Sequence, residues 1–242
     1  MRTRRLEGER RLDWGAGGGF SPADLSGHVE TWIGATLPES AAAATWPGLT
    51  GTHTLSQATG GFCPLIATDA GKRYALFDGT DDFMIKDPYT QGSAAGHSAF
   101  VAMRLGGNGN FPMVFTTANS VRELRLNGTN RFLEWEDAGP GGGTTDDAAV
   151  PTGEDHVVGV TAASGGGVTL WLDGVAVATG TESGDYSATP STALSLGNRV
   201  GGALYLPAGS RVYAATFCEA SLSAAEVALL NDYLKSHTVN AP

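Results

Sequence analysis

Two acidic side chains, Glu134 and Glu136, stand two residues apart in a segment that alternates like a β-strand. Side chains at such positions point to the same face of a sheet. A pair of carboxylates on one face is the arrangement with which glycoside hydrolases supply a nucleophile and a general acid. The positions after Asp137 are Ala138 and Gly139, so no further acid extends the pair. We therefore expect a solvated strand face here and no enzyme.

Aromatic and polar residues of neighbouring strands offer a second chemistry, the stacking and hydrogen bonding of a sugar. Trp171 alternates with Thr169 and Asp173 in segment 168–173, which places its indole among polar residues, as a glycan platform would be. Trp135 shares its face with Leu133, which favours a core position. Packing between two sheets stays the alternative for both Trp residues. The candidate glycan-binding residues are Trp171, Asp173, Trp135 and Arg125.

Three carboxylates fall within five residues of segment 77–83, Phe-Asp-Gly-Thr-Asp-Asp-Phe. Asp78, Asp81 and Asp82 offer the oxygen ligands that Ca²⁺ prefers. The favoured alternative is a tight turn whose Asp side chains accept hydrogen bonds from nearby backbone N–H groups. We expect no metal and no other cofactor, because the five His residues show no pair at metal-ligand spacing.

Composition excludes several classes of protein. The 242 residues carry 25 Asp and Glu against 15 Lys and Arg, and a net charge of −10 opposes binding to nucleic-acid phosphates. No apolar run approaches the roughly 18 residues that a membrane span needs, so we expect no membrane partner. Cys63 and Cys218 lack C-x-x-C spacing, and two buried thiols are favoured over one disulfide.

Short alternating segments, separated by Gly, Asn, Asp, Ser and Pro, follow one another from Phe20 onward. This pattern is typical of an all-β sandwich or barrel. Long loops are expected at 137–154 and 180–191. The predicted strands are 72–77, 83–85, 98–105, 113–117, 122–126, 131–136, 156–162, 168–173, 175–179, 193–197 and 211–218.

One segment, 223–236, predicts an α-helix. Ser223 and Glu226 have the spacing of a capping box, and Leu222 and Val227 that of a hydrophobic staple. A single helical turn is also expected at 21–25, where Ser21 precedes a Pro.

Three motifs, Phe-Asp-Gly-Thr-Asp-Asp-Phe at 77–83, Leu-Trp-Leu-Asp-Gly-Val at 170–175 and Leu-Ser-Ala-Ala-Glu at 222–226, follow one another along the chain. Their order resembles that of the concanavalin A-like lectin/glucanase superfamily, in particular laminin-G-like jelly-roll domains of bacteria and their phages. The resemblance covers residues 20–236 and is carried by these three motifs. It implies an all-β fold, a two-sheet antiparallel jelly-roll sandwich of about a dozen strands, here with one C-terminal α-helix. Glucanases on this fold carry Glu-x-Asp-x-x-Glu, which the segment at Glu134 does not match.

A short basic arm precedes this domain. Residues 1–13 hold five Arg and three acids, a net of +2, and a Gly-rich joint follows at 15–19. We divide the chain into an arm and joint at 1–19 and a jelly-roll domain at 20–242. The alternation of Arg and acids suits ion pairs with a protein neighbour better than binding to phosphates. The candidate partner-anchoring residues are Arg2, Arg4, Arg5, Arg10 and Arg11.

Two further features bear on function. No apolar segment typical of a secretory signal follows the first Arg residues, and the arm has too few apolar residues to fold alone. With the resemblance, these features predict a bacteriophage virion protein, made in the host cytoplasm, that displays a lectin-like domain for adhesion to glycans or host surfaces. It would decorate the capsid or form part of a tail tip or fibre, with other virion proteins and copies of itself as partners. The alternatives are a glycan-binding module of a bacterial surface protein and a glucanase-like glycoside hydrolase.

Overall fold

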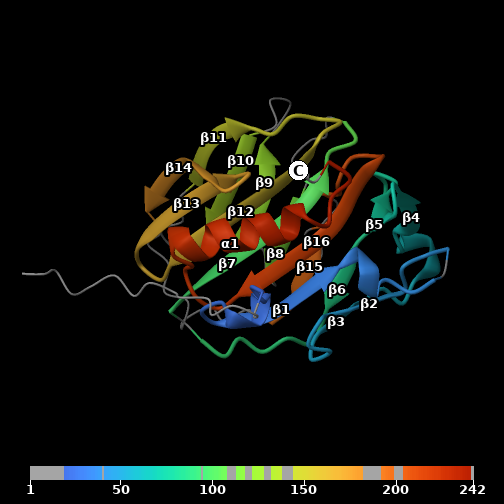
Figure 1. The fold of residues 1–242 in the computed structure, drawn as a ribbon, viewed down its shortest axis with the longest axis horizontal. Coiled ribbons are helices and arrows are strands. Elements are labelled where there is room, and N and C mark those ends of the chain that lie inside the picture. Colours follow the sequence, from blue (N-terminus) through green and yellow to red (C-terminus); the bar gives the residue numbers. More distant parts are fainter. Residues whose placement is uncertain are drawn as a thin grey trace, which may run out of the picture.

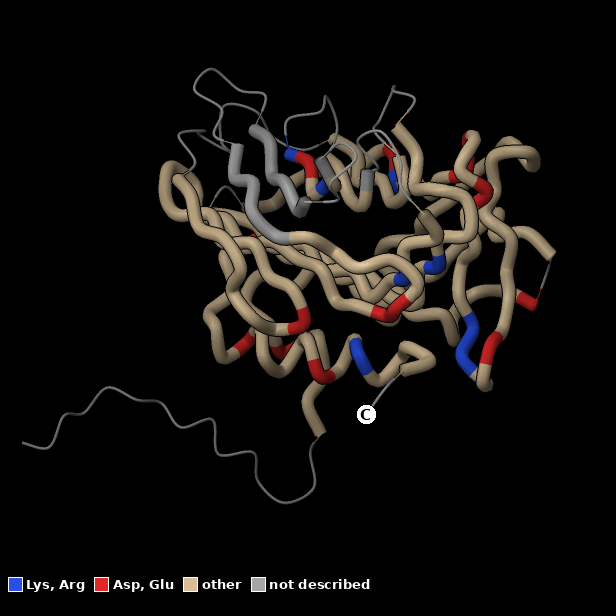
Figure 2. Tube along the Cα trace, turned by 90° about the horizontal axis from the view of Figure 1, so that it is seen from above, with Lys and Arg blue, Asp and Glu red and all other residues tan. Residues whose placement is uncertain are grey.

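The structure is a computed structural model, and the residues that it describes are 19–39, 41–93, 95–107, 113–117, 122–127, 132–137, 144–181, 192–198 and 204–240. Two antiparallel sheets stack face to face, and one helix covers the outer side of one of them (Figure 1). Seen from above, the molecule has three successive layers: the helix, the sheet that the helix covers, and the other sheet (Figure 2). The predicted all-β sandwich with a C-terminal helix is therefore confirmed.

The sheet next to the helix, sheet A, has eight strands. Its hydrogen-bonded order is β14-β13-β12-β7-β16-β5-β4, and β1 also pairs with β16. The strands are β1 (His28–Ile33), β4 (Leu65–Asp69), β5 (Lys72–Phe77), β7 (Gly96–Arg104), β12 (Asp155–Ala163), β13 (Gly167–Leu172), β14 (Val175–Thr181) and β16 (Ser210–Cys218).

The opposite sheet, sheet B, also has eight strands, in the order β11-β10-β9-β8-β15-β6-β3-β2. The strands are β2 (Thr45–Pro47), β3 (Thr54–Ser56), β6 (Met84–Lys86), β8 (Met113–Thr117), β9 (Arg122–Asn127), β10 (Phe132–Asp137), β11 (Thr144–Ala149) and β15 (Leu194–Leu196). The helical elements are η1 (Pro22–Asp24), η2 (Gly34–Thr36), η3 (Gly60–Phe62) and α1 (Ala224–Lys235).

Alternation along the strands separates two apolar cores. The larger core lies between the sheets, where Trp32 and Phe77 of sheet A meet residues such as Phe115 and Leu124 of sheet B. The smaller core lies between sheet A and α1 and includes Phe100, Tyr213 and Leu230. A β-strand sends alternate side chains to opposite faces, so sheet A can supply both cores from the same strands.

The start of α1 is fixed as the sequence predicts. The Oγ of Ser223 accepts a hydrogen bond from the backbone N–H of Glu226, whose carboxylate accepts one from the backbone N–H of Ser223 at 2.8 Å. Glu226 also accepts from the N–H of Ser26 at 2.9 Å, which ties the segment after η1 to the helix. Burial alone would raise the pKa of Glu226, but these hydrogen bonds outweigh it and lower the pKa to about 2.

The predicted strands are present, with ends displaced by at most two residues. The predicted helical turn at 21–25 is η1, capped by Ser21. The predicted loop at 137–154 is wrong, because β11 forms there. Its residues, Thr-Thr-Asp-Asp-Ala-Ala, show no apolar alternation, and pairing with β10 at the edge of sheet B holds them extended. The first two residues of the predicted loop at 180–191 belong to β14, which ends at Thr181, and residues 182–191 lie outside the described residues.

Cys63 and Cys218 are both buried free thiols, as the sequence favours. Burial raises the pKa of the Cys63 thiol, and the negative charge of Asp82 adds to this effect. Among the described residues, no helix has the length and apolar character to cross a membrane.

Candidate functional site

The outer face of sheet B presents a row of mostly polar residues across six strands. Backbone register places Thr45 opposite Ser56, Ser56 opposite Ile85, and Ile85 opposite Ser195. It continues from Ser195 to Thr116 and from Thr116 to Glu123. Within the described part of the chain, no helix packs on this face. We call these residues the polar row: Thr45, Ser56, Ile85, Ser195, Thr116 and Glu123.

The polar row becomes more enclosed from one end to the other. Thr45 and Ser56 are exposed, whereas Ser195, Thr116 and Glu123 are each fully buried although they point away from the main core. Burying polar atoms in a protein costs free energy unless hydrogen bonds or charges compensate. The row therefore ends in buried polar residues on the side of sheet B that faces away from the main core, and this end is its recessed end.

An ion pair stands at the recessed end of the polar row. Nη1 of Arg125 lies 3.2 Å from Oε2 of Glu123, and the side chains are 13% and 0% exposed. These two residues share the outer face of β9, while Leu124 and Leu126 lie in the main core. A carboxylate held beside a guanidinium presents hydrogen-bond acceptors and donors together, which suits a ligand rich in hydroxyl groups.

The predicted acid pair lies on the strand next to Arg125. Register places Glu134 opposite Arg125 and Glu136 opposite Glu123, so the backbone puts the pair at the recessed end of the polar row. Trp135 stands opposite Leu124, a core position. The side chains of Glu134, Trp135 and Glu136 lie outside the described residues, and their predicted roles stay predictions.

Trp171 is not on an exposed polar face, and this prediction is wrong. Its side chain is 9% exposed and belongs to the core between sheet A and α1. Its indole N–H donates to Oγ1 of Thr161 at 3.0 Å. The sequence indicates the outer face of β13 correctly, but α1 covers that face and leaves no platform for a sugar.

Asp173 belongs to a structural junction on the same side of the molecule. Its Oδ1 accepts hydrogen bonds from the N–H of Val157 at 3.0 Å and from Nζ of Lys235 at 2.8 Å, and its Oδ2 pairs with Nδ1 of His156 at 2.7 Å. Burial raises the pKa of Asp173, but these partners outweigh it and hold the pKa below its usual range. Asp173 thus fastens the end of α1 to sheet A, far from the polar row.

Among the predicted glycan-binding residues whose side chains the structure describes (Arg125, Trp171 and Asp173), only Arg125 lies on the outer face of sheet B. Thr116, Ser195 and Ser56 stand on three different strands and are not among the residues predicted from the sequence. The alternation of Leu194, Ser195 and Leu196 does indicate an outward Ser, but the register that aligns it with Thr116 appears only in the fold. The partner-anchoring Arg residues of the arm lie outside the described residues.

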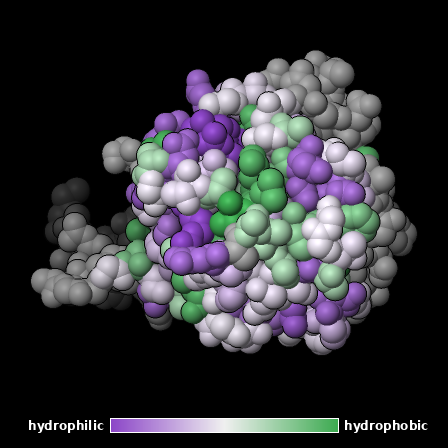
Figure 3. All heavy atoms as spheres, turned by 90° about the vertical axis from the view of Figure 1, so that its right-hand side faces the viewer, coloured by the Kyte–Doolittle hydropathy of each residue, from purple (hydrophilic) through white to green (hydrophobic). Residues whose placement is uncertain are grey.

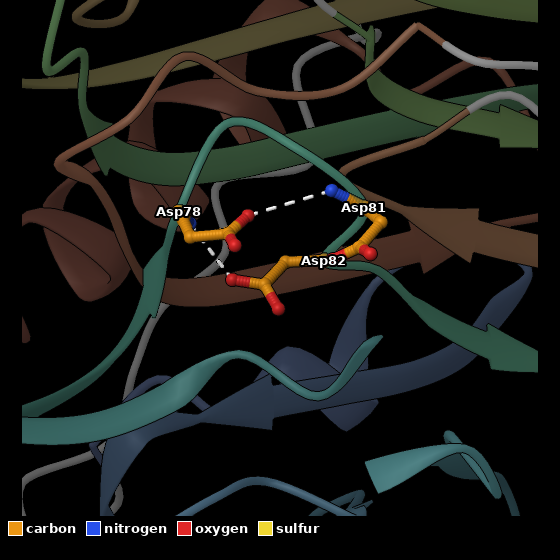
Figure 4. Close-up of side chains that lie close together, drawn as sticks. All are labelled: Asp78, Asp81 and Asp82. Carbon is orange, nitrogen blue, oxygen red and sulfur yellow. Dashed lines mark hydrogen bonds between the residues drawn. The ribbon is translucent and has the colours of Figure 1, made fainter. Parts of the chain in front are cut away.

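The three carboxylates of segment 77–83 build the predicted turn (Figure 4). Oδ1 of Asp78 accepts from the N–H of Thr80 at 2.8 Å and of Asp81 at 3.4 Å, and Oδ2 of Asp82 accepts from the N–H of Asp78 at 2.7 Å. Gly79 has a φ of +84°, and a Cβ there would lie 2.5 Å from the backbone N of Ala208. One ligand oxygen from each Asp lies within 4.8 Å of the others. The hydrogen bonds account for the turn without a metal.

The titration of Asp82 should make the thermal stability of the domain depend on pH. Burial, together with the negative charges of Asp78 and Asp81, raises its pKa to about 6. An unfolded Asp titrates near pH 4, so the ionisation of Asp82 should destabilise the fold progressively as pH rises from about 4 to about 6. Asp82→Asn keeps an acceptor oxygen and removes this titration. As pH rises across that interval, the Tm of Asp82→Asn should therefore increase relative to that of the wild type, as measured by thermal unfolding at a series of pH values.

A difference in Tm that stays constant between pH 4 and 7 would contradict this prediction. Calcium provides the control. We expect millimolar CaCl₂ to leave the Tm of the wild type unchanged, whereas a rise in Tm that Asp82→Asn abolishes would show a cation site at the turn.

Two other features mark the surface of the described residues. A cleft of about 330 Å³ is lined by residues that include His28, His53 and Tyr89, whose hydroxyl donates to Glu219. An apolar patch ringed by hydrophilic residues faces the viewer in Figure 3. On that side of the molecule, η3 and β4 expose Phe62 (38%) and Leu65 (52%). None of these places combines enclosure, an ion pair and a continuous polar row.

The sequence itself defines the class of protein. A family profile of the concanavalin A-like lectin/glucanases superfamily matches residues 77–228, well over half of the chain. The chain therefore belongs to this superfamily, as the motifs at 77–83 and 222–226 indicate. No sequence among curated proteins matches the chain.

Solved structures share the fold at low sequence identity. Domain 4 of AbnA, a GH43 extracellular arabinanase from Geobacillus stearothermophilus in complex with arabinotriose, is 14% identical with a TM-score of 0.61, over 86% of this chain and 100% of that chain. Botulinum neurotoxin type C, whose cell entry is dependent upon interaction with two ganglioside molecules, is 10% identical with a TM-score of 0.59. The match covers 88% of this chain and 53% of the toxin chain.

Trypanosoma rangeli sialidase in complex with sialic acid is 10% identical with a TM-score of 0.61. The match covers 88% of this chain but 34% of the sialidase, so the chain spans about a third of that enzyme's length. At these identities the likeness describes the fold.

Proposed function

We propose that this domain binds carbohydrate through the outer face of sheet B and does not cleave it. The observation that carries the proposal is the recessed end of the polar row, where Arg125 pairs with a buried Glu123 and Thr116 and Ser195 follow in register on the neighbouring strands. Carboxylate, guanidinium and hydroxyl groups together match the donors and acceptors of sugar hydroxyls. The fold likeness to an arabinotriose-bound domain and to a ganglioside-dependent toxin supports the same class of ligand.

Binding and cleavage are separated by one screen. The purified domain is tested against immobilised oligosaccharides, and every glycan that binds is incubated with it and assayed for released reducing ends. We expect binding to at least one glycan class and product release at background. Glu134→Gln/Glu136→Gln should leave that background unchanged, because the pair lacks the additional acid of the glucanase motif. Cleavage that disappears in the double variant would show a hydrolase instead.

The basic arm supports a finer proposal, that the domain is displayed on a bacteriophage virion. Residues 1–13 interleave five Arg with three acids and contain few apolar residues, so they suit docking on a protein neighbour rather than a core of their own. The Gly-rich joint at 15–19 would let the domain orient freely relative to the docked arm. The partners would be other virion proteins and copies of this chain.

Deletion of residues 1–19 should leave a folded domain that no longer joins its assembly. Exposed ion pairs contribute at most about 1 kcal/mol each, so incorporation should fall steeply without the arm and only slightly for a single Arg→Ala. The measurement is the amount of chain in purified particles, with circular dichroism to verify folding. Normal incorporation of the shortened chain would assign attachment to the sandwich. A monomeric full-length protein that joins no particle would favour a bacterial surface module.

A further inference from the structure

A second polar cavity lies on the sheet A side of the molecule, away from the outer face of sheet B. It measures about 400 Å³ and is enclosed by η2, the β4–β5 hairpin and the residues that follow α1. Two cations and one imidazole line it, and none of the described lining residues is an acid or an aromatic amino acid other than His. The lining residues are Gly34, Ala35, Thr68, Gly71, Lys72, Arg73 and His237.

Backbone contacts hold the basic groups in place. A Cβ on Gly34 would lie 1.7 Å from the carbonyl oxygen of Arg73, so η2 packs directly on β5 and only glycine fits there. Nη1 of Arg73 donates to the carbonyl of Leu37 at 2.6 Å, and Nζ of Lys72 donates to the carbonyl of Ser236 at 2.6 Å. Both side chains keep further N–H donors, because a guanidinium has five and an ammonium has three. A site arranged before binding loses less entropy when a ligand arrives.

His237 contributes a ring nitrogen that the fold itself does not use. Its Nε2 is buried and makes no hydrogen bond with any described residue. Its ring packs edge-on against Tyr233, with the centroids 4.9 Å apart, which fixes its orientation. Burial lowers the pKa of His237, and the positive charge of Lys72 adds to this effect. His237 therefore forms a fixed part of the cavity wall beside Lys72.

The charges around the cavity favour an anion. The chain as a whole has a net charge of −10, yet this lining is basic. The carboxylate of Glu39 pairs with Arg73 at 3.2 Å, but the Glu39 side chain is 87% exposed and can be displaced by a ligand. Oδ2 of Asp69 forms an ion pair with Nη1 of Arg211 at 2.7 Å, so its negative charge is already compensated.

We propose that this cavity binds an acidic sugar, a monosaccharide-sized ligand that carries one carboxylate or sulfate. Cavities of about 300–1,000 Å³ accommodate small organic ligands, so the space exceeds the need of a bare inorganic anion. Lys72 and Arg73 bind the oxyanion. Thr68 and backbone groups then hydrogen-bond the sugar hydroxyls. No ring is present on which a nucleotide base would stack.

Glucuronate and glucose 6-sulfate serve as the carboxylated and sulfated probes, with glucose and inorganic sulfate as controls, in calorimetric titrations of the full chain. At least one acidic sugar should bind at least about 10-fold more tightly than either control, because charge-assisted hydrogen bonds add to those of the hydroxyls. Binding of glucose with equal affinity, or of inorganic sulfate as tightly as of both sugars, would overturn the proposal.

Two variants locate the site. Lys72→Met and Arg73→Met should each weaken binding of the acidic sugar about 10-fold, while Lys86→Met, on β6 of sheet B, should leave it unchanged. Unaltered affinity in both folded variants would contradict the assignment. In the wild type, NMR should show the pKa of His237 rising when the acidic sugar is added, and an unchanged pKa would count against binding in this cavity. These readouts are independent of Arg125 and of the polar row, so this proposal can fail while the proposed function holds.

Discussion

Leu230→Ala is expected to lower the free energy of unfolding by about 2–5 kcal/mol, the usual cost of removing a fully buried Leu side chain. Leu230 is 0% exposed and lies in the core between sheet A and α1, with Val227 and Leu234 on the same helix. That core also holds Trp171 and Tyr213, so a cavity at Leu230 removes contacts with sheet A itself. Chemical denaturation of the purified domain measures the loss.

Leu229→Ala is the matched control. Leu229 precedes Leu230 on α1 but is only partly buried, so the same substitution leaves a smaller cavity and should cost clearly less. Truncation before Leu222 should remove the whole apolar face of α1 and leave no cooperative unfolding transition. Equal losses in the two Leu variants, or an unchanged Tm after truncation, would show that α1 does not stabilise sheet A.

Arg125→Lys is expected to weaken glycan binding about 10-fold or more while the domain stays folded. Lysine keeps the positive charge beside the buried carboxylate of Glu123, so the variant avoids an unpaired buried charge. It loses the planar fork with which a guanidinium makes several directed hydrogen bonds at once. Hydrogen bonds to charged groups contribute about 1.5–3 kcal/mol each, which sets the size of the effect. Titration with the glycan identified by the screen gives the affinity.

Arg211→Lys provides the comparison on the other sheet. Arg211 also pairs with a carboxylate, that of Asp69 at 2.7 Å, but it belongs to β16 of sheet A. This variant should bind glycan like the wild type. If both Lys variants lose affinity to the same extent, a general loss of stability and not the position of Arg125 explains the effect.

The sequence predicts those parts of the fold whose signal is local. An apolar run that ends at the Asp78-Gly79 turn signal places the strand at 72–77, and the Ser223–Glu226 spacing gives the start of α1, because each signal is set by near neighbours in the chain. It misses β1 and β4, and also β2 and β3, which have three residues each and lie at the end of sheet B. β11 is missed because pairing with β10, and not its own composition, makes it a strand.

The candidate site is harder to predict because it depends on register and on which face is covered. Alternation assigns Trp171 correctly to the face of β13 opposite Leu170, but nothing local shows that a helix about 60 residues later covers that face. Arg125 is named as a candidate from the sequence. The alignment of its ion-pair partner Glu123 with Thr116, and of Thr116 with Ser195, arises from strand pairing, and β8 and β15 are far apart in the sequence.

The most direct test of glycan binding on sheet B is an NMR titration of ¹⁵N-labelled domain with a neutral oligosaccharide that the screen identifies. A neutral ligand avoids the basic cavity at Lys72 and Arg73. Our account predicts that the largest chemical-shift changes fall on Thr116, Glu123, Arg125 and Ser195, with α1 unaffected. Changes confined to α1 or to the β4–β5 hairpin, with the strands of sheet B unmoved, would contradict it.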